Sequence, residues 1–174
     1  VPGVMALESR YYVGNLDATE QEDGFISVLH SADWFYRAFD TAGLHVAVTD
    51  DDAVAGFIAV TPPPPRSDPG LPSIVRAMLD LADTLDFNGR PIAQQRFAFR
   101  GPVCIDKSAR GRGVYSKFNT VTREAYRGRF DCGVLFVAAD NVRSLHTTTT
   151  KLEATSLAVF EVDARQFHFL AFDF

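Results

Sequence analysis

The chain has 174 residues, of which 47% are hydrophobic and 22% are charged. This balance excludes an intrinsically disordered chain, and the length suits one domain over residues 1–174 with a sizeable core. The longest apolar runs fall far short of the ~20 residues that a membrane helix needs. The two cysteines are too few for a disulfide framework or a zinc cluster. We therefore expect a cytoplasmic protein with no membrane partner and no metal.

The formal net charge is −5, but the charge is unevenly distributed. Residues 96–129 hold nine Lys or Arg against two Asp or Glu, a local balance of +7 that leaves −12 for the rest of the chain. An acidic protein with one basic segment indicates a local anion site rather than a nucleic-acid surface, so we expect no nucleic-acid partner. The alternative is that these side chains form only a solvated helix face.

The first 43 residues predict one strand and two helices. Residues 11–13 end a first strand, and Asp17 with Glu20 has the spacing of a capping box at a helix start. The apolar residues that follow are assigned to one face of that helix: Phe25, Ile26 and Leu29. Ser31 caps a second short helix, which ends near Gly43.

The middle of the chain predicts a hairpin and a longer helix. Two β-rich runs, residues 44–49 and 53–61, flank an aspartate turn, and the prolines at 62–65 stop the second run. Apolar residues then recur at helical spacing over residues 74–85, and Asn88-Gly89 is expected to end that helix.

The last eighty residues predict alternating strands and helices. The expected elements are a strand over residues 97–105, a loop over 107–113, a helix from 114, an apolar strand over 133–139, a weak helix over 142–152, and strands over 155–162 and 166–172. The strand–loop–helix–strand unit in the middle predicts a parallel crossover. The fold class is therefore α/β, with the parallel pair inside a mixed sheet.

The sharpest motif is the loop from Asp106 to Tyr115, which is rich in glycine and arginine and leads from a strand into a helix. The first N–H groups of a helix have no intrahelical acceptor, and together with the helix dipole they bind phosphate. Two arginines within the loop add bidentate donors. The loop lacks the Walker A spacing, and a dinucleotide fingerprint would need glycine where Ser116 stands.

The loop matches R-x-x-G-x-G/A through Arg110, Gly113 and the apolar Val114, although Tyr115 replaces the final small residue. In this respect it resembles the GNAT superfamily of N-acetyltransferases. Two further segments resemble that family: Val54-Ala55-Gly56-Phe57 is similar to its V-x-G-F strand, and Asn141-Val142-Arg143-Ser144 to its N-x-x-[AS] helix start. The likeness in element order spans nearly the whole chain.

The resemblance implies a splayed central sheet flanked by helices on both faces, with acetyl-CoA as co-substrate in the wedge between residues 97–105 and 133–139. It implies that Asn141 binds the pantetheine and that Arg143 and Lys151 bind further phosphates. The backbone groups it assigns are Val103, Cys104 and Ile105 for the pantetheine, and Arg110, Gly111, Arg112, Gly113, Val114 and Tyr115 for the pyrophosphate.

The implied reaction is direct acyl transfer to a primary amine, and its acid and base stay open. The family often has a tyrosine acid in the helix after the N-x-x-[AS] motif, and this chain has none there. Thr148 stands nearest that place, and His146 is the nearest group that titrates near neutrality. For the base, Asp140 ends a central strand. The alternatives are Glu124, His45, His168 or a relaying water; Cys104 is expected to be buried rather than nucleophilic.

Two function classes therefore remain. The first is an acyltransferase acting on a small-molecule amine or a protein amine. The second is a non-catalytic acyl-CoA-binding or regulatory domain, which Tyr115 and the missing tyrosine favour. The aromatic last strand, with Phe167, Phe169, Phe172 and Phe174, also predicts a homodimer that pairs through the C-terminal strands.

Overall fold

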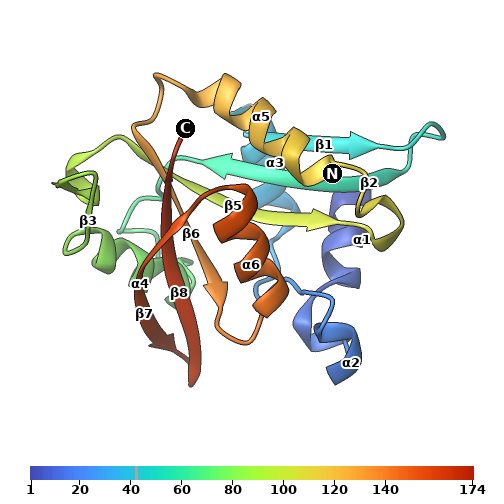
Figure 1. Cartoon of the computed structure of the whole chain (residues 1–174), viewed down its shortest axis with the longest axis horizontal. Coiled ribbons are helices and arrows are strands. Elements are labelled where there is room, and N and C mark those ends of the chain that lie inside the picture. Colours follow the sequence, from blue (N-terminus) through green and yellow to red (C-terminus); the bar gives the residue numbers. More distant parts are fainter. Residues whose placement is uncertain (42) are drawn as a thin grey trace.

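The computed structural model describes residues 1–41 and 43–174 and contains a six-stranded sheet in the order β1-β2-β5-β6-β8-β7 (Figure 1). The strands are β1 (Leu44–Val48), β2 (Val54–Thr61), β5 (Phe97–Ile105), β6 (Cys132–Ala138), β7 (Thr155–Val162) and β8 (Arg165–Asp173). A separate two-stranded ribbon joins β3 (Asp86–Phe87) to β4 (Arg90–Pro91). The predicted α/β class and the parallel pair inside a mixed sheet are confirmed.

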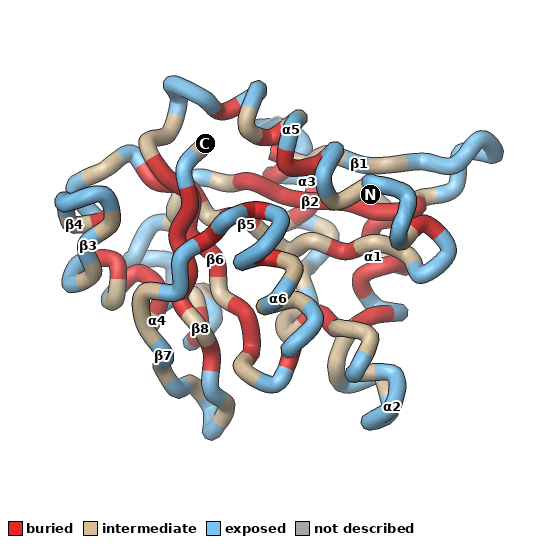
Figure 2. The backbone as a smooth tube through the Cα atoms, viewed as in Figure 1, coloured by how far each residue is buried: buried red, intermediate tan, exposed pale blue. Residues whose placement is uncertain are grey.

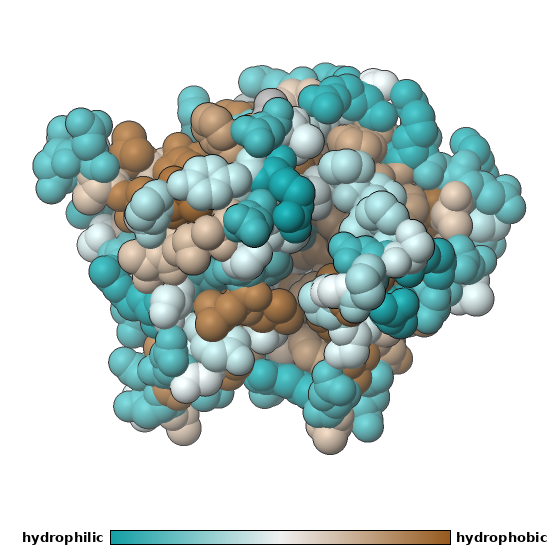
Figure 3. Space-filling view, turned by 180° about the vertical axis from the view of Figure 1, so that it is seen from behind, coloured by the Kyte–Doolittle hydropathy of each residue, from teal (hydrophilic) through white to brown (hydrophobic). Residues whose placement is uncertain are grey.

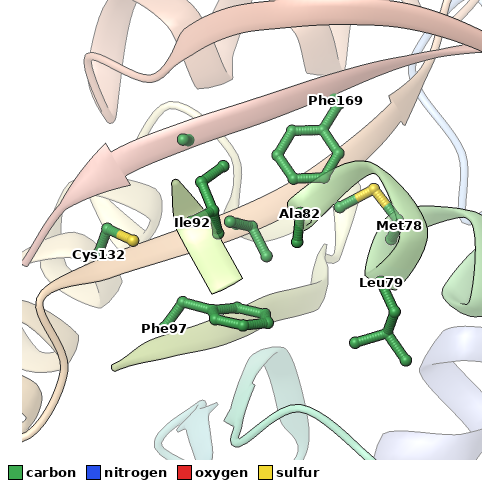
Figure 4. Packing of buried hydrophobic residues seen from close by; sticks show 9 residues of the cluster. Met78, Leu79, Ala82, Ile92, Phe97, Cys132 and Phe169 are labelled. Atoms are coloured by element: carbon green, nitrogen blue, oxygen red, sulfur yellow. The ribbon is translucent and has the colours of Figure 1, made fainter. Parts of the chain in front are cut away.

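Helices cover both faces of this sheet. Residues of α5 (Val114–Tyr126) and α6 (Val142–Lys151) pack on one face, and those of α1 (Pro2–Arg10), α3 (Ala32–Asp40) and α4 (Ser73–Ala82) pack on the other. Alternating residues of the strands serve the two sides, so that Leu135 packs on the first face and Val134 on the second. Figure 4 shows the cluster under α4, in which Met78 and Phe169 lie among buried side chains.

The N-terminal prediction is wrong in two places. Residues 2–10 form α1, and the strand expected at residues 11–13 is reduced to one bridge between Tyr12 and Ile26. The capping box is confirmed, because Asp17 accepts from the Glu20 N–H and Glu20 accepts from the Asp17 N–H, but α2 (Ala18–Gln21) ends after four residues. The expected helical face beyond it is instead irregular chain, because residue Gly24 adopts φ +88°.

Later elements follow the predictions more closely. Ser31 caps α3 through the Trp34 N–H, and β1 and β2 form the expected antiparallel hairpin. Helix α4 ends at Ala82, earlier than expected, and Asn88-Gly89 forms the turn of the β3–β4 ribbon. Two 3-10 turns, Ile92–Gln94 and Lys107–Ala109, flank β5, and a third lies at Val13–Asn15.

The parallel pairing of β5 with β6 is short. Phe97–Phe99 pairs with Cys132–Val134. Beyond these residues β5 and β6 do not pair with each other, although each still pairs with its other neighbour, β2 or β8. An ion pair closes the paired end: the Arg96 Nη2 donates to Asp131 at 2.6 Å, and the Asp131 N–H donates to the Arg96 carbonyl. Its hydrogen bonds to Arg96 hold the pKa of Asp131 down at about 2. The sheet is therefore splayed, clamped at one end and open at the other.

A bulge re-aims β5 within the open part. Ile58 of β2 pairs with Val103, whereas Val60 pairs with Arg100, so β5 carries one extra residue at this point. Gly101 lies at the bulge with φ +137°, a conformation that suits glycine. Side chains of a strand point alternately to the two faces of the sheet, and the extra residue shifts this alternation by one. Beyond the bulge, the residues that would have faced α5 therefore face the other side.

Strand β8 lies inside the sheet, between β6 and β7. Phe167, Phe169 and Phe172 are 6%, 0% and 1% exposed, so the aromatic surface expected on the last strand does not exist (Figure 2). The edge strand is β7 instead. Homodimer formation stays a prediction, but this argument for it is wrong.

Gly133 of β6 tests how tightly β8 is packed. A Cβ at this position would overlap ring atoms Cε1 and Cζ of Phe172, which is 1% exposed and has no room to move. We expect Gly133→Ala to lower the free energy of unfolding by about 1–3 kcal/mol in urea denaturation. Gly70→Ala is the control, because its Cβ would make only an ordinary contact with Asp68. Equal losses in the two variants would contradict this packing.

Candidate functional site

The open part of the splay forms a cavity of about 1270 Å³. Its walls are the unpaired halves of β5 and β6, the loop that enters α5, the inner side of α6, the segment 23–31 and the prolines at 62–65. Figure 3 views the α1, α3 and α4 side of the molecule, where apolar surface gathers around a hollow near the middle of the face. The volume exceeds the usual range for small-ligand sites, so the cavity has room for a long ligand or for two ligands.

The predicted anion loop lies at the edge of this cavity. Gly111 and Gly113 have φ of +74° and +80°, and a Cβ on either would meet nothing within 4 Å. Gly113 is the N-cap of α5 and offers no side chain to the first N–H groups of the helix. The N–H groups of Val114, Tyr115 and Ser116 therefore depend on a ligand or solvent, which is the geometry of an anion site.

The arginines of the loop do not contribute as expected. The Arg110 guanidinium donates to the carbonyls of Ile105 and Asp23, at 2.9 and 2.8 Å, and lies over the Tyr11 ring. It fixes the loop to the segment before the cavity rather than presenting a fork to a phosphate. Arg112 is exposed and does not line the cavity.

Asp23 brings two cations together at the cavity edge. Its carboxylate contacts Lys107 Nζ at 2.6 Å and Arg143 Nη1 at 3.1 Å. The hydrogen bond and charge of Lys107, with the charges of Arg143 and Arg110, hold the pKa of Asp23 below its usual range. Arg143, expected to bind phosphate, is thus already paired, and an incoming phosphate would compete with Asp23 for it.

Asn141, expected to bind the pantetheine, is 3% exposed and has both ends of its amide engaged. Its Nδ2 donates to the Phe25 carbonyl at 2.8 Å, and its Oδ1 accepts from the Ser144 N–H at 3.3 Å. Asn141 therefore caps α6 and ties down the segment 23–31. Val103, Cys104, Ile105 and Lys151 all line the cavity as expected.

Of the three predicted catalytic residues, one lines the cavity and two do not. Thr148 is buried and lines the cavity. His146 is exposed on α6 outside the cavity lining, and Asp140 is outside it too, with both carboxylate oxygens accepting from Arg165 at 3.0 and 2.8 Å. Neither side chain is placed to exchange a proton with a ligand in the cavity.

The alternative bases also lie outside the cavity lining. His45 contacts the Tyr126 hydroxyl at 2.9 Å, and burial lowers its pKa. His168 contacts the Ser156 hydroxyl at 2.9 Å, and Glu124 is on the exposed side of α5.

A Glu–His pair that the sequence does not predict lies at the cavity, where His30 is part of the lining and Glu8 is buried behind it. Glu8 of α1 is 1% exposed; its Oε1 lies 2.7 Å from His30 Nδ1, and its Oε2 accepts from the His30 N–H at 3.0 Å. A carboxylate oxygen accepts hydrogen bonds, so the contact suits the tautomer with a proton on Nδ1, in which Nε2 is the nitrogen that can accept a proton. His30 lines the cavity beside Trp34, with ring centroids 4.2 Å apart. This is the arrangement of an oriented general base.

No sequence signal joined these two residues, because they are 22 positions apart and α1 was not foreseen. The same helix also supports the anion loop. Arg10 pairs with Asp106 at 2.7 Å, and the Tyr11 hydroxyl accepts from the Lys107 N–H at 2.8 Å. One short helix thus positions both the candidate base and the loop.

Two further features concern the described residues: groups that could hold a metal ion, and helices that could span a membrane. Among residues 1–41 and 43–174, no group of three His, Cys, Asp or Glu side chains is placed to hold a metal ion. In that same part of the chain, no helix has the length and apolar character to cross a bilayer.

Comparison with known proteins identifies the fold. No family model and no curated protein matches the chain. Among solved structures, a GNAT-family acetyltransferase from Streptococcus agalactiae aligns with TM-score 0.64 at 14% identity, over 99% of this chain and 89% of the other. A Streptococcus mutans protein aligns with TM-score 0.61 at 15% identity, over 99% and 92%. A chain of the NatC complex, solved with a Gag peptide and CoA, aligns with TM-score 0.59 at 12% identity, over 89% and 87%. These likenesses show the GNAT fold.

The two thiols provide a check on the buried strands. Burial raises the pKa of Cys104 to about 12 and that of Cys132 to about 11. Because the thiolate is the reactive form, we expect both to be alkylated by iodoacetamide at pH 8 at least about a hundredfold more slowly in native protein than in urea. Mass spectrometry of quenched samples measures the rates. Fast labelling of native Cys104 would contradict its burial and reopen an acyl-enzyme route.

Proposed function

We propose that this chain, which has the fold of the GNAT acetyltransferases, transfers an acyl group from acetyl-CoA or a related acyl-CoA to a primary amine. The observation that carries the proposal is the splay itself. Strands β5 and β6 separate after three paired residues, and the uncapped start of α5 lies at the edge of the resulting cavity. A long ligand with an anionic group at one end fits this combination.

The donor side rests on backbone groups. The N–H groups of Val114, Tyr115 and Ser116 would hold the pyrophosphate. Residues Val103–Ile105 pair with β2 but not with β6, and their backbone groups on the β6 side would pair with the pantetheine arm as a further strand. Lys107 and Arg143 would meet the phosphates by exchanging their contacts with Asp23. The related NatC structure contains CoA, which supports this assignment.

The acceptor side supplies the base. His30 Nε2 would take a proton from the attacking amine while Glu8 stabilises the imidazolium that forms. The nitrogen lone pair forms the new bond to the thioester carbon, the carbon–sulfur bond breaks, and the sulfur leaves as a thiolate that is then protonated. A backbone N–H of Val103 or Cys104 would stabilise the oxyanion, a contribution of about 3–4 kcal/mol. Thr148 remains the candidate nearest the expected position of the acid.

The second candidate function is a binding domain without turnover. Tyr115 in place of a small residue and the absence of a tyrosine in α6 favour it. Release of CoA above the hydrolysis background with any amine of a panel separates the two functions, since a binding domain releases none.

The loop assignment is tested by a charge placed on it. Gly113→Asp puts a carboxylate beside the first N–H groups of α5, so we expect the binding of acetyl-CoA and desulfo-CoA to weaken at least about tenfold in calorimetric titration. Gly128→Asp is the matched control, because Gly128 has φ +79°, nothing within 4 Å of its Cβ, and a place outside the cavity lining. Equal weakening in both variants would argue against the loop as the phosphate site.

The base assignment is tested by His30→Gln. We expect kcat/KM to fall about a hundredfold at pH 7, measured as CoA release with a diamine, an amino sugar and a short peptide as acceptors. The deficit should shrink as the pH approaches the amine pKa, ~10, because the acceptor then loses its proton to bulk water.

His168→Gln serves as the control for this experiment, since His168 does not line the cavity. A pH-independent deficit in His30→Gln, or an equal deficit in His168→Gln, would show that His30 is not the base.

A further inference from the structure

A buried arginine lies where the strands separate. Arg100 is the first residue of β5 beyond those paired with β6, it is 3% exposed, and it lines the cavity. Its Nη2 donates to Asn119 Oδ1 of α5 at 2.7 Å, and its guanidinium lies over the rings of Tyr115 and Phe172, at 5.2 and 5.8 Å from their centroids. No ion pair in the described part of the chain includes it.

Two polar atoms at this point are buried without a hydrogen-bond partner among the described residues: Arg100 Nε and the Tyr115 hydroxyl. Burial lowers the pKa of Arg100, whereas the charge of the Tyr115 hydroxyl and its contact with the guanidinium oppose that fall. Buried polar groups are nearly always satisfied in folded proteins, and a buried charge without a counter-charge is costlier still. The positive charge of Arg100, uncompensated on the cavity wall, therefore indicates an anionic group supplied by a ligand.

A purely structural role explains the arrangement poorly. Aromatic faces and one amide oxygen hold the guanidinium in place, but they do not neutralise it. An apolar side chain of similar length would pack in the same space without the desolvation cost. A water molecule would accept a hydrogen bond and still leave the positive charge uncompensated.

We propose that Arg100 and Tyr115 form a buried subsite for an anionic oxygen group of the acyl donor. The inference rests on the proposed function, because it takes the cavity to be the donor site. Two parts of an acyl-CoA carry such oxygens: the phosphates of the carrier, and the free carboxylate of a dicarboxylic acyl chain. The N–H groups at the start of α5 already meet the requirements of a phosphate, so Arg100 at the inner end favours the acyl carboxylate.

The test uses two variants that keep the local shape. Tyr115→Phe removes only a hydroxyl and is expected to leave the melting temperature unchanged. Arg100→Met removes the buried charge but leaves Asn119 Oδ1 without its donor, so its melting temperature is measured first to show that the variant is folded at the temperature of the titration. Arg129→Met, in the turn that follows α5 and outside the cavity lining, controls for the loss of one positive charge. Calorimetric titration with CoA, acetyl-CoA and succinyl-CoA gives the affinities.

We expect Arg100→Met to weaken succinyl-CoA binding about tenfold or more, Tyr115→Phe to weaken it less, and Arg129→Met to leave it unchanged. Loss for succinyl-CoA alone assigns the subsite to the acyl carboxylate and makes dicarboxylic acyl-CoA the preferred donor class. Equal loss for all three ligands assigns the subsite to a carrier phosphate. Wild-type affinities retained in both variants would overturn the subsite alone, whereas a wild type that binds none of the three ligands would overturn the proposed function with it.

Discussion

The site depends on how little of β5 pairs with β6. Three paired residues, clamped by Arg96 and Asp131, hold the strands together at one end, and the bulge at Gly101 turns β5 away beyond them. Unpaired backbone groups inside a sheet are costly unless something else meets them. The fold therefore keeps a strand-shaped gap in its interior, and the loop at Gly113 places helix N–H groups at the mouth of that gap.

The cations beside this gap, Lys107 and Arg143, are already paired with the carboxylate of Asp23. A phosphate at the loop would therefore have to exchange with a carboxylate that is in place. Such a replacement costs less reorganisation than desolvating free ammonium and guanidinium groups. Arg100 differs, since no carboxylate in the described residues pairs with it.

Sequence patterns predicted the parts of the molecule that local chemistry determines. The strand Phe97–Ile105 follows from a run of apolar residues, and the cap at Ser31 from a side chain that can accept a backbone hydrogen bond. The loop glycines mark positions where the backbone adopts a positive φ. The Glu8–His30 pair has no local signature, because α1 brings together residues far apart in sequence. In the sequence, Arg100 is one residue within a predicted strand, and Tyr115 is a departure from a motif. The structure singles out both residues because it buries their polar atoms, and the spacing of residues in the sequence does not predict that burial.

The position of β8 has a consequence for the order of assembly. Strand β7 is synthesised before β8, yet within the described sheet it pairs with β8, which lies between it and β6. Until β8 is in place, one edge of the apolar strand β6 lacks its partner, and Phe169 and Phe172 lack their burial. The nascent chain thus exposes an unpaired apolar strand, which can pair with other chains and aggregate. A chaperone that shields β6 during translation would protect this step, which precedes formation of the cavity.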